Sequence, residues 1–234
     1  MQMDSRTWGY GVGARIVLGF LAAFMFGVAA LLFSVPALAG ETDHSGDGFV
    51  YGTGVIMAGF GLFLTFGLIA IARTRIALED GIAGTLLDAT VPNGHSWLLV
   101  PRLRTIRLPV AEIRSVERRQ EVTRSFGLSS LRDALSVVTA TGERIGLFST
   151  ASTALIRLPL DEIAGAIAAA AGVAVADDGT VLTKASGLYG EASSSWTERP
   201  LDAPAAGKAR RAAYLTLQII VALMSITFIV RACS

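Results

Sequence analysis

The chain has 234 residues, of which 52% are hydrophobic and only 17% charged, and its mean hydropathy is +0.56. An average soluble domain is about a quarter charged, so this composition points to lipid, and the formal net charge of +1 argues against a protein that binds polyanions as a whole. The single cysteine, Cys233, excludes an internal disulfide and a cysteine-based metal site within one chain.

The first apolar element is a charge-free run at residues 16–39, which follows a polar N-terminal segment, residues 1–15. At about 1.5 Å per residue this run exceeds a hydrocarbon core of about 30 Å, and it therefore predicts a membrane-spanning helix. A cleaved signal peptide is the alternative, because Ala37 and Ala39 form a small-x-small site before Gly40. The run is longer than the apolar region of roughly 7–15 residues in signal peptides, which favours a retained helix.

Two more charge-free runs predict a second span at residues 48–72 and a third at residues 212–230. The loop 40–47 between the first two spans carries acidic residues and no Lys or Arg. Basic residues gather instead before the first span and at both ends of the large middle segment: Arg6, Arg15, Arg73, Arg75, Lys208, Arg210 and Arg211. By the positive-inside rule we expect a multi-pass protein of the cell (plasma or inner) membrane, with the N-terminus and the middle segment cytoplasmic and the loop and the tail 231–234 facing outward.

Small residues recur at four-residue spacing in the first two spans and predict faces along which helices approach closely. These positions are Gly19, Ala23, Gly27, Gly54 and Ala58. The spans contain no acidic residue, basic residue or histidine. The usual signature of an ion or proton pathway is therefore missing, and a small transporter or channel subunit is kept only as an alternative.

The middle segment, residues 73–172, has β-rich patterning followed by one helix. Strand-like runs occur at residues 74–78, 97–100, 105–108, 111–122, 134–139 and 144–148. Asn93-Gly94 and Thr141-Gly142 predict hairpin turns. Helical spacing behind Pro159 predicts a helix that ends before Gly172. This order predicts an α+β layer arrangement in which an all-antiparallel sheet, curled into a small sandwich or half-open barrel, is capped by one C-terminal helix.

Four stretches of this segment carry a resemblance to a known family. They are TRIALEDGI at 74–82, LPVAEIRSVERRQ at 108–120, RSFGLSSL at 124–131 and LPLDEIAGAI at 158–167. In this order, and after paired membrane helices, the chain resembles the bacterial pleckstrin-homology-like (PH-like) domain proteins, whose functions are largely unassigned. The resemblance implies a seven-stranded β-sandwich capped by the helix 159–171, without enzymatic activity. The third span and the long tail depart from the family layout.

Residues 173–211 are rich in turn-forming residues and predict a linker that returns the chain to the membrane. The arginine-rich stretch between residues 102 and 133 includes Arg102, Arg104 and Arg107, which form a possible lipid-facing basic patch. The other interpretation of these arginines is the solvated outer face of a sheet.

Histidine-based chemistry is not expected, because His44 and His95 are the only histidines and are predicted on opposite sides of the membrane. The acidic loop around His44 is interpreted as an exposed turn, although oxygen-rich loops can bind a hard cation. No nucleotide, zinc or hydrolase signature is present, so we expect no catalytic residues, no cofactor and no metal.

These observations favour a non-enzymatic, membrane-anchored interaction module that binds a protein partner or associates with itself, with no nucleic acid and no small-molecule substrate. An alternative is a domain that senses anionic lipid at the membrane surface.

Overall fold

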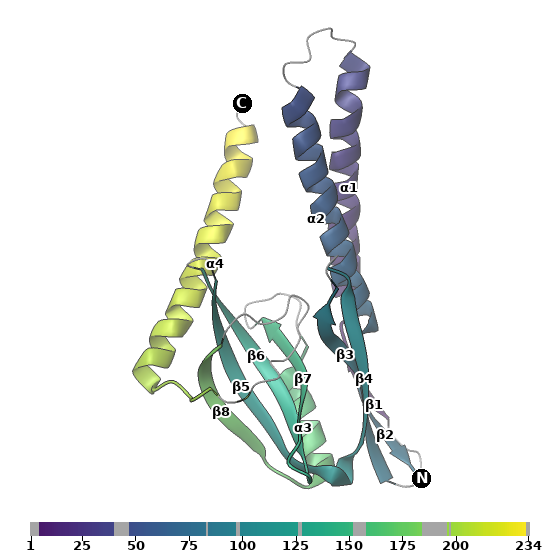
Figure 1. Ribbon diagram of the computed structural model, residues 1–234, viewed down its shortest axis with the longest axis vertical. Coiled ribbons are helices and arrows are strands. Elements are labelled where there is room, and N and C mark those ends of the chain that lie inside the picture. Colours follow the sequence, from purple (N-terminus) through teal and green to yellow (C-terminus); the bar gives the residue numbers. More distant parts are fainter. Residues whose placement is uncertain are drawn as a thin grey trace.

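The computed structural model describes residues 5–39, 47–82, 84–96, 99–125, 128–151, 158–183, 196 and 198–232. Two long helices rise together from a domain built of two β-sheets, and a third long helix rises from the far side of that domain (Figure 1). The expected combination of apolar helices with an α+β domain is therefore confirmed at this level.

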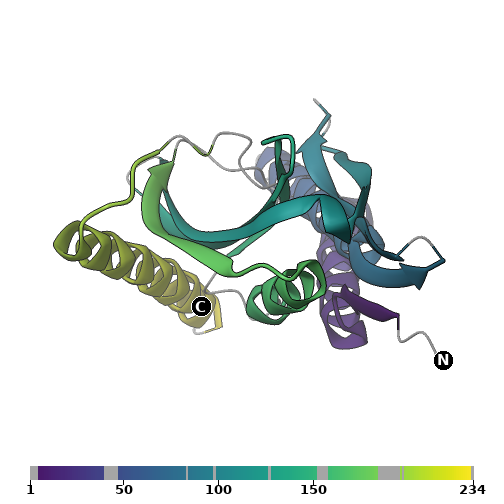
Figure 2. The same cartoon turned by 90° about the horizontal axis from the view of Figure 1, so that it is seen from below.

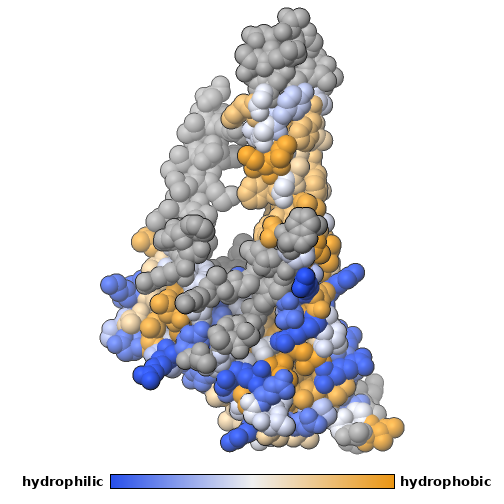
Figure 3. All heavy atoms as spheres, viewed as in Figure 1, coloured by the Kyte–Doolittle hydropathy of each residue, from blue (hydrophilic) through white to orange (hydrophobic). Residues whose placement is uncertain are grey.

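The paired helices are α1, Val12–Ala39, and α2, Asp47–Arg73. Both are long and apolar enough to cross a membrane, over Val12–Ser34 and Gly48–Arg73, which agrees with the first two expected spans. Exposed apolar side chains cover these helices above the polar surface of the domain (Figure 3).

The third expected span, residues 212–230, is helical and belongs to α4, Ala203–Ala232. Among the described residues, however, two helices rather than three meet the criteria for a span. Helix α4 begins nine residues before the expected span and carries Lys208, Arg210 and Arg211 in its first half. That half packs on the domain, where Ala209 and Ala213 of α4 contact Val122 and Leu131.

Sheet A consists of β1, Arg6–Gly9, β2, Arg75–Gly81, β3, Gly84–His95, and β4, Pro101–Pro109, paired antiparallel in that order. Strand β1 was not expected, because residues 1–15 were interpreted only as a cytoplasmic N-terminus. Trp8 explains the strand: its side chain is buried opposite Ile76, and its indole N–H donates to Glu162 across the domain at 2.8 Å.

Sheet B follows a 3₁₀ turn, Val110–Glu112, and contains β5, Ile113–Ser125, β6, Leu128–Thr139, β7, Arg144–Ala151, and β8, Val175–Thr183. The strand order is β7-β6-β5-β8, and the β5–β8 pair is parallel. The expectation of a seven-stranded, all-antiparallel sandwich is therefore wrong: the described chain has two four-stranded sheets, and β8 lies where a linker was expected. A parallel neighbour requires a crossover connection, and helix α3, Leu160–Ala171, provides it.

Helices α3 and α4 cover the same face of sheet B (Figure 2). Ile163 and Ile167 of α3 are fully buried against apolar side chains from both sheets, among them Leu87 and Leu135. The expected helix is confirmed, including its end at Gly172, whose left-handed φ of 67° suits a residue without a Cβ.

The turn predicted at Asn93-Gly94 is wrong. Strand β3 continues to His95 through a register shift, and the chain reverses at residues 96–100, where the Leu99 N–H donates to the Ser96 carbonyl at 2.9 Å. Leu99 and Val100 therefore lie in a turn rather than in the expected strand 97–100; Trp97 and Leu98 are outside the described residues. The turn predicted at Thr141-Gly142 is confirmed, with φ of 84° at Gly142.

Candidate interaction site

An open cleft of about 370 Å³ lies between α3 and α4 on sheet B. Its lining comes from five elements and is almost entirely polar: Arg118, Arg119 and Gln120 of β5, Asp133 of β6, Asp161 of α3, Asp177 and Gly179 of β8, and Arg210 of α4. Residues far apart in the chain meet here because the parallel β5–β8 pair places β8 next to the centre of the sheet.

Arg118 stands at the centre of this cleft and is held by two carboxylates. Its guanidinium donates to Asp161 at the start of α3 and to Asp177 at 3.3 Å. Burial alone would lower the pKa of Arg118, but the hydrogen bonds to Asp161 and Asp177 raise it above its ordinary value. Both carboxylates are largely exposed, so they are also accessible to a binding partner.

The position of Asp177 depends on an irregularity in β8. The register shifts by one residue between Arg118 and Gln120, and Gly179 takes up the extra residue with φ of 72°. The Asp177 carboxylate accepts the Gly179 backbone N–H at 2.9 Å. This backbone hydrogen bond, opposed by burial and reinforced by Arg118, lowers the pKa of Asp177 and keeps it ionised.

The floor of the cleft is a chain of polar contacts. Gln120 donates to Asp133 at 3.2 Å and accepts from the Thr180 hydroxyl at 3.4 Å. Arg210 of α4 donates to the same hydroxyl at 2.8 Å. These contacts also fix α4 to the sheet.

A second groove, of about 340 Å³, begins where the cleft ends and shares Asp133 and Asp161 with it. It runs along the start of α3 and adds Glu162 and the Thr150 hydroxyl to a partly apolar wall. Both grooves meet at Asp161, at the start of α3. Together they are lined by four acids, Asp133, Asp161, Glu162 and Asp177, and by three arginines, Arg118, Arg119 and Arg210, so the surface is of mixed charge with a small excess of acids.

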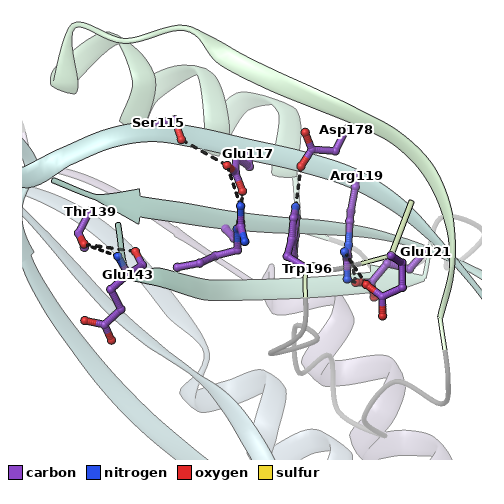
Figure 4. A network of polar contacts seen from close by, with 11 residues as sticks. Ser115, Glu117, Arg119, Glu121, Thr139, Glu143, Asp178 and Trp196 are labelled. Atoms are coloured by element: carbon purple, nitrogen blue, oxygen red, sulfur yellow. Dashed lines mark hydrogen bonds and ion pairs between the residues drawn. The ribbon is translucent and has the colours of Figure 1, made fainter. Parts of the chain in front are cut away.

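Arg119 follows Arg118 on β5, so its side chain points to the opposite face of sheet B, where it belongs to a buried ionic network (Figure 4). Arg119 is 1% exposed and donates through Nε and Nη2 to one oxygen of Glu121, at 3.0 and 2.7 Å, and through Nη1 to Glu198 at 3.1 Å. The ring of Trp196 lies 3.7 Å from the Arg119 guanidinium, and its indole N–H donates to Asp178 at 2.6 Å. The network therefore fastens the chain segment that leads into α4 onto the sheet.

Glu117 and Arg144 extend this network. Arg144 donates to both oxygens of Glu117, at 2.7 and 3.2 Å, and these hydrogen bonds raise the pKa of Arg144 despite some burial. Each arginine of the network thus has a carboxylate partner, and the arrangement fits a structural role better than a chemical one.

The three arginines expected to form a basic patch do not lie on one face. Arg102 is exposed near the β3–β4 turn. Arg104 points between the sheets and donates to the Gly146 carbonyl of β7. Arg107 is on the outer face of sheet A, 3.7 Å from Asp88.

The residues expected to pack helices together are only partly brought together. A Cβ on Gly54 would meet the Phe33 ring at 3.0 Å, and one on Gly19 would meet Leu68 at 3.8 Å, so both positions face the partner helix. Ala23 and Gly27 are exposed, whereas Ala58 is half-buried. A close contact that the spacing did not reveal joins Gly61 to the Phe26 ring, at 3.1 Å from an added Cβ.

Sequence reasoning did not find the cleft. Its residues carry no motif, and Asp177 was interpreted as part of a turn in a linker. Only the sheet topology brings Arg118, Asp161 and Arg210 together. His44 lies outside the described residues, as does the side chain of His95, and the part of the chain that is described contains no group of three potential metal ligands.

Comparison of the chain with protein-family models, with curated proteins and with solved structures found no match.

Proposed function

We propose that this protein is a non-enzymatic interaction module anchored in the bacterial inner membrane by α1 and α2, with the second half of α4 as a third span. In this arrangement the N-terminus and the PH-like domain face the cytoplasm, and the C-terminus faces outward. The basic residues at the ends of these helices support this orientation.

The observation that carries the proposal is the pair of grooves around the start of α3. Asp133, Asp161, Glu162 and Asp177 line them. Three arginines line them as well: Arg118 is paired with Asp161 and Asp177, Arg119 is paired with Glu121 and Glu198, and Arg210 donates to the Thr180 hydroxyl. A basic segment of a partner protein, or of a second copy of this chain, would find accessible carboxylates there.

The test uses photo-crosslinking in living cells that express the full chain. A photoreactive residue replaces Gly165, an exposed position of α3 where an added Cβ meets nothing within 4 Å. We expect one predominant adduct, either with a single partner or with a second copy. The double substitution Asp133→Asn and Asp161→Asn should reduce it several-fold, whereas Glu143→Gln, an exposed acid at the distant β6–β7 turn, should not. An adduct equally strong in the double variant, or no adduct at all, would count against the proposal.

Anionic-lipid sensing is the second candidate function, and one observation favours it in a restricted form. Of the three arginines considered for lipid contact, Arg102 is exposed near the start of β4, a strand that contacts α2. Arg104 and Arg107 have partners within the domain and are not part of this candidate.

A further inference from the structure

Along four elements of the molecule, exposed side chains change from basic to apolar in the direction in which α1 and α2 leave the domain. Along α1, exposed Arg15 is followed by exposed Ile16, and along α4, exposed Arg211 is followed by Leu215. In α2 the corresponding basic residue is Arg73, with apolar residues towards the loop between α1 and α2. These three changes define the level at which the proposed membrane begins, because arginine prefers the head groups and apolar side chains prefer the interior.

The fourth element is the β3–β4 hairpin. Arg75, the first residue of β2, pairs with Thr90, so the last residues of β3 and the turn that follows extend past the start of β2. Strands β3 and β4 contact α2, and their hairpin points in the same direction as the helices (Figure 1). It too changes from exposed Arg102 to apolar Val100 and Leu99 at its end.

The composition of this turn is unusual for a turn that faces water. Leu99 and Val100 are 40% and 37% exposed. Turns usually carry Gly, Asn, Asp or Ser at such positions. Leu99 also has a left-handed φ of 61°, a conformation that costs a leucine free energy and that glycine or asparagine would adopt more easily. Two exposed apolar side chains at such a position would be accommodated better in an apolar environment, and the turn extends past the start of β2 on the side from which α2 leaves the domain.

We propose that the β3–β4 turn is an additional membrane contact: Leu99 and Val100 insert into the interfacial region of the cytoplasmic leaflet, while Arg102 lies at its anionic head groups. The inference rests on the proposed anchoring by α1 and α2. Its consequence is that the domain is held at a fixed orientation to the bilayer by its own sheet, in addition to the helices.

The opposite end of sheet A supplies a matched control. Ile82, in the β2–β3 turn, is an apolar turn residue that is fully exposed, but it lies at the end of β3 remote from the β3–β4 turn. Like Leu99 and Val100, Ile82 is an apolar residue in a turn of sheet A. It differs from them in lying at the end of the sheet that is remote from the proposed membrane.

The experiment uses the full chain with Cys233→Ser, reconstituted in vesicles of phosphatidylcholine with or without phosphatidylglycerol. A polarity-sensitive fluorophore is attached to Val100→Cys, to Ile82→Cys, or to Val55→Cys, which is an exposed position within α2. Quenching by a lipid with a shallow spin label is compared with quenching by aqueous iodide. We expect several-fold more lipid quenching and less iodide quenching at position 100 than at position 82.

Position 55 separates this inference from the anchoring on which it rests. Suppose that position 55 is quenched from within the lipid. If position 100 then behaves like position 82, or if α2 shields it from both quenchers, the turn does not insert and the inference is overturned. If position 55 is not quenched from the lipid, the anchoring itself is wrong. Arg102→Glu should lower lipid quenching at position 100 in the vesicles that contain phosphatidylglycerol; an unchanged value would remove the head-group contact.

Discussion

Removing the Arg119 guanidinium with Arg119→Met is expected to destabilise the domain severely. The side chain of Glu121 is fully buried, and one of its oxygens accepts both hydrogen bonds from Arg119 while the other has no partner among the described residues. Without Arg119 this carboxylate would be a buried charge without compensation. Breaking a buried ion pair on one side costs about 3–5 kcal/mol, whereas replacing both partners by apolar residues is often neutral or stabilising.

The measurement is thermal unfolding of the full chain in detergent, followed by far-ultraviolet circular dichroism, because loss of the stacking on Trp196 would disturb fluorescence. At about 2–4 °C per kcal/mol for a chain of this size, Arg119→Met should lower the Tm by about 6–20 °C. Adding Glu121→Leu should recover most of that loss. Arg118→Met is the matched control, since it leaves two largely exposed aspartates and should cost at most about 1 kcal/mol. Equal Tm values for the two single variants would refute the reasoning.

Three other changes test the packing, the bulge and the cleft. Gly61→Val should destabilise the α1–α2 pair by about 1–3 kcal/mol through overlap with Phe26, whereas Gly59→Val, which meets nothing within 4 Å, should not; unfolding in detergent compares them. Gly179→Ala should cost about 1–2 kcal/mol, measured by urea unfolding, because its φ is left-handed. The lowered pKa of Asp177 implies stability that is present above about pH 4 and lost as the pH falls through the lowered value, so Asp177→Asn should weaken the acid dependence of unfolding.

Each of these three has an outcome that contradicts it. Equal stability of the two glycine-to-valine variants would mean that the ring of Phe26 moves aside at no cost. An unchanged free energy of unfolding for Gly179→Ala would show that the bulge tolerates a Cβ. An acid dependence identical to that of the unchanged chain would show that the carboxylate at position 177 gains nothing from its neighbours in the folded state.

The helices and the β6–β7 hairpin were predictable because their signals are local. The apolar runs of α1 and α2, the spacing of Ile163 and Ile167 and the glycine that ends α3 all lie within one or two turns of chain. Strands β5, β6 and β7 follow each other through short connections, so their pairing follows from order alone.

The remaining elements depend on contacts between distant parts of the chain. Strand β1 has four residues and is recognisable only through its pairing with β2, and β8 contains an Asp-Asp-Gly sequence that locally resembles a turn. The same limit applies to the cleft, since Arg118 and Arg210 line it together but lie far apart in the sequence. At Asn93-Gly94 the local turn signal was overruled because the ladder with β4 continues to His95.

The pairing of β1 with β2 has a consequence for biosynthesis. Because translation proceeds from the N-terminus, Arg6–Gly9 leaves the ribosome before α1 and α2 and has no strand to join until both long helices and Arg75–Leu78 have been translated. Sheet A therefore closes only after the helical hairpin is complete, and the β1–β2 ribbon then locks the base of that hairpin. A chain whose second helix was misplaced would leave Trp8, which is buried in the folded domain, without its place beside Ile76.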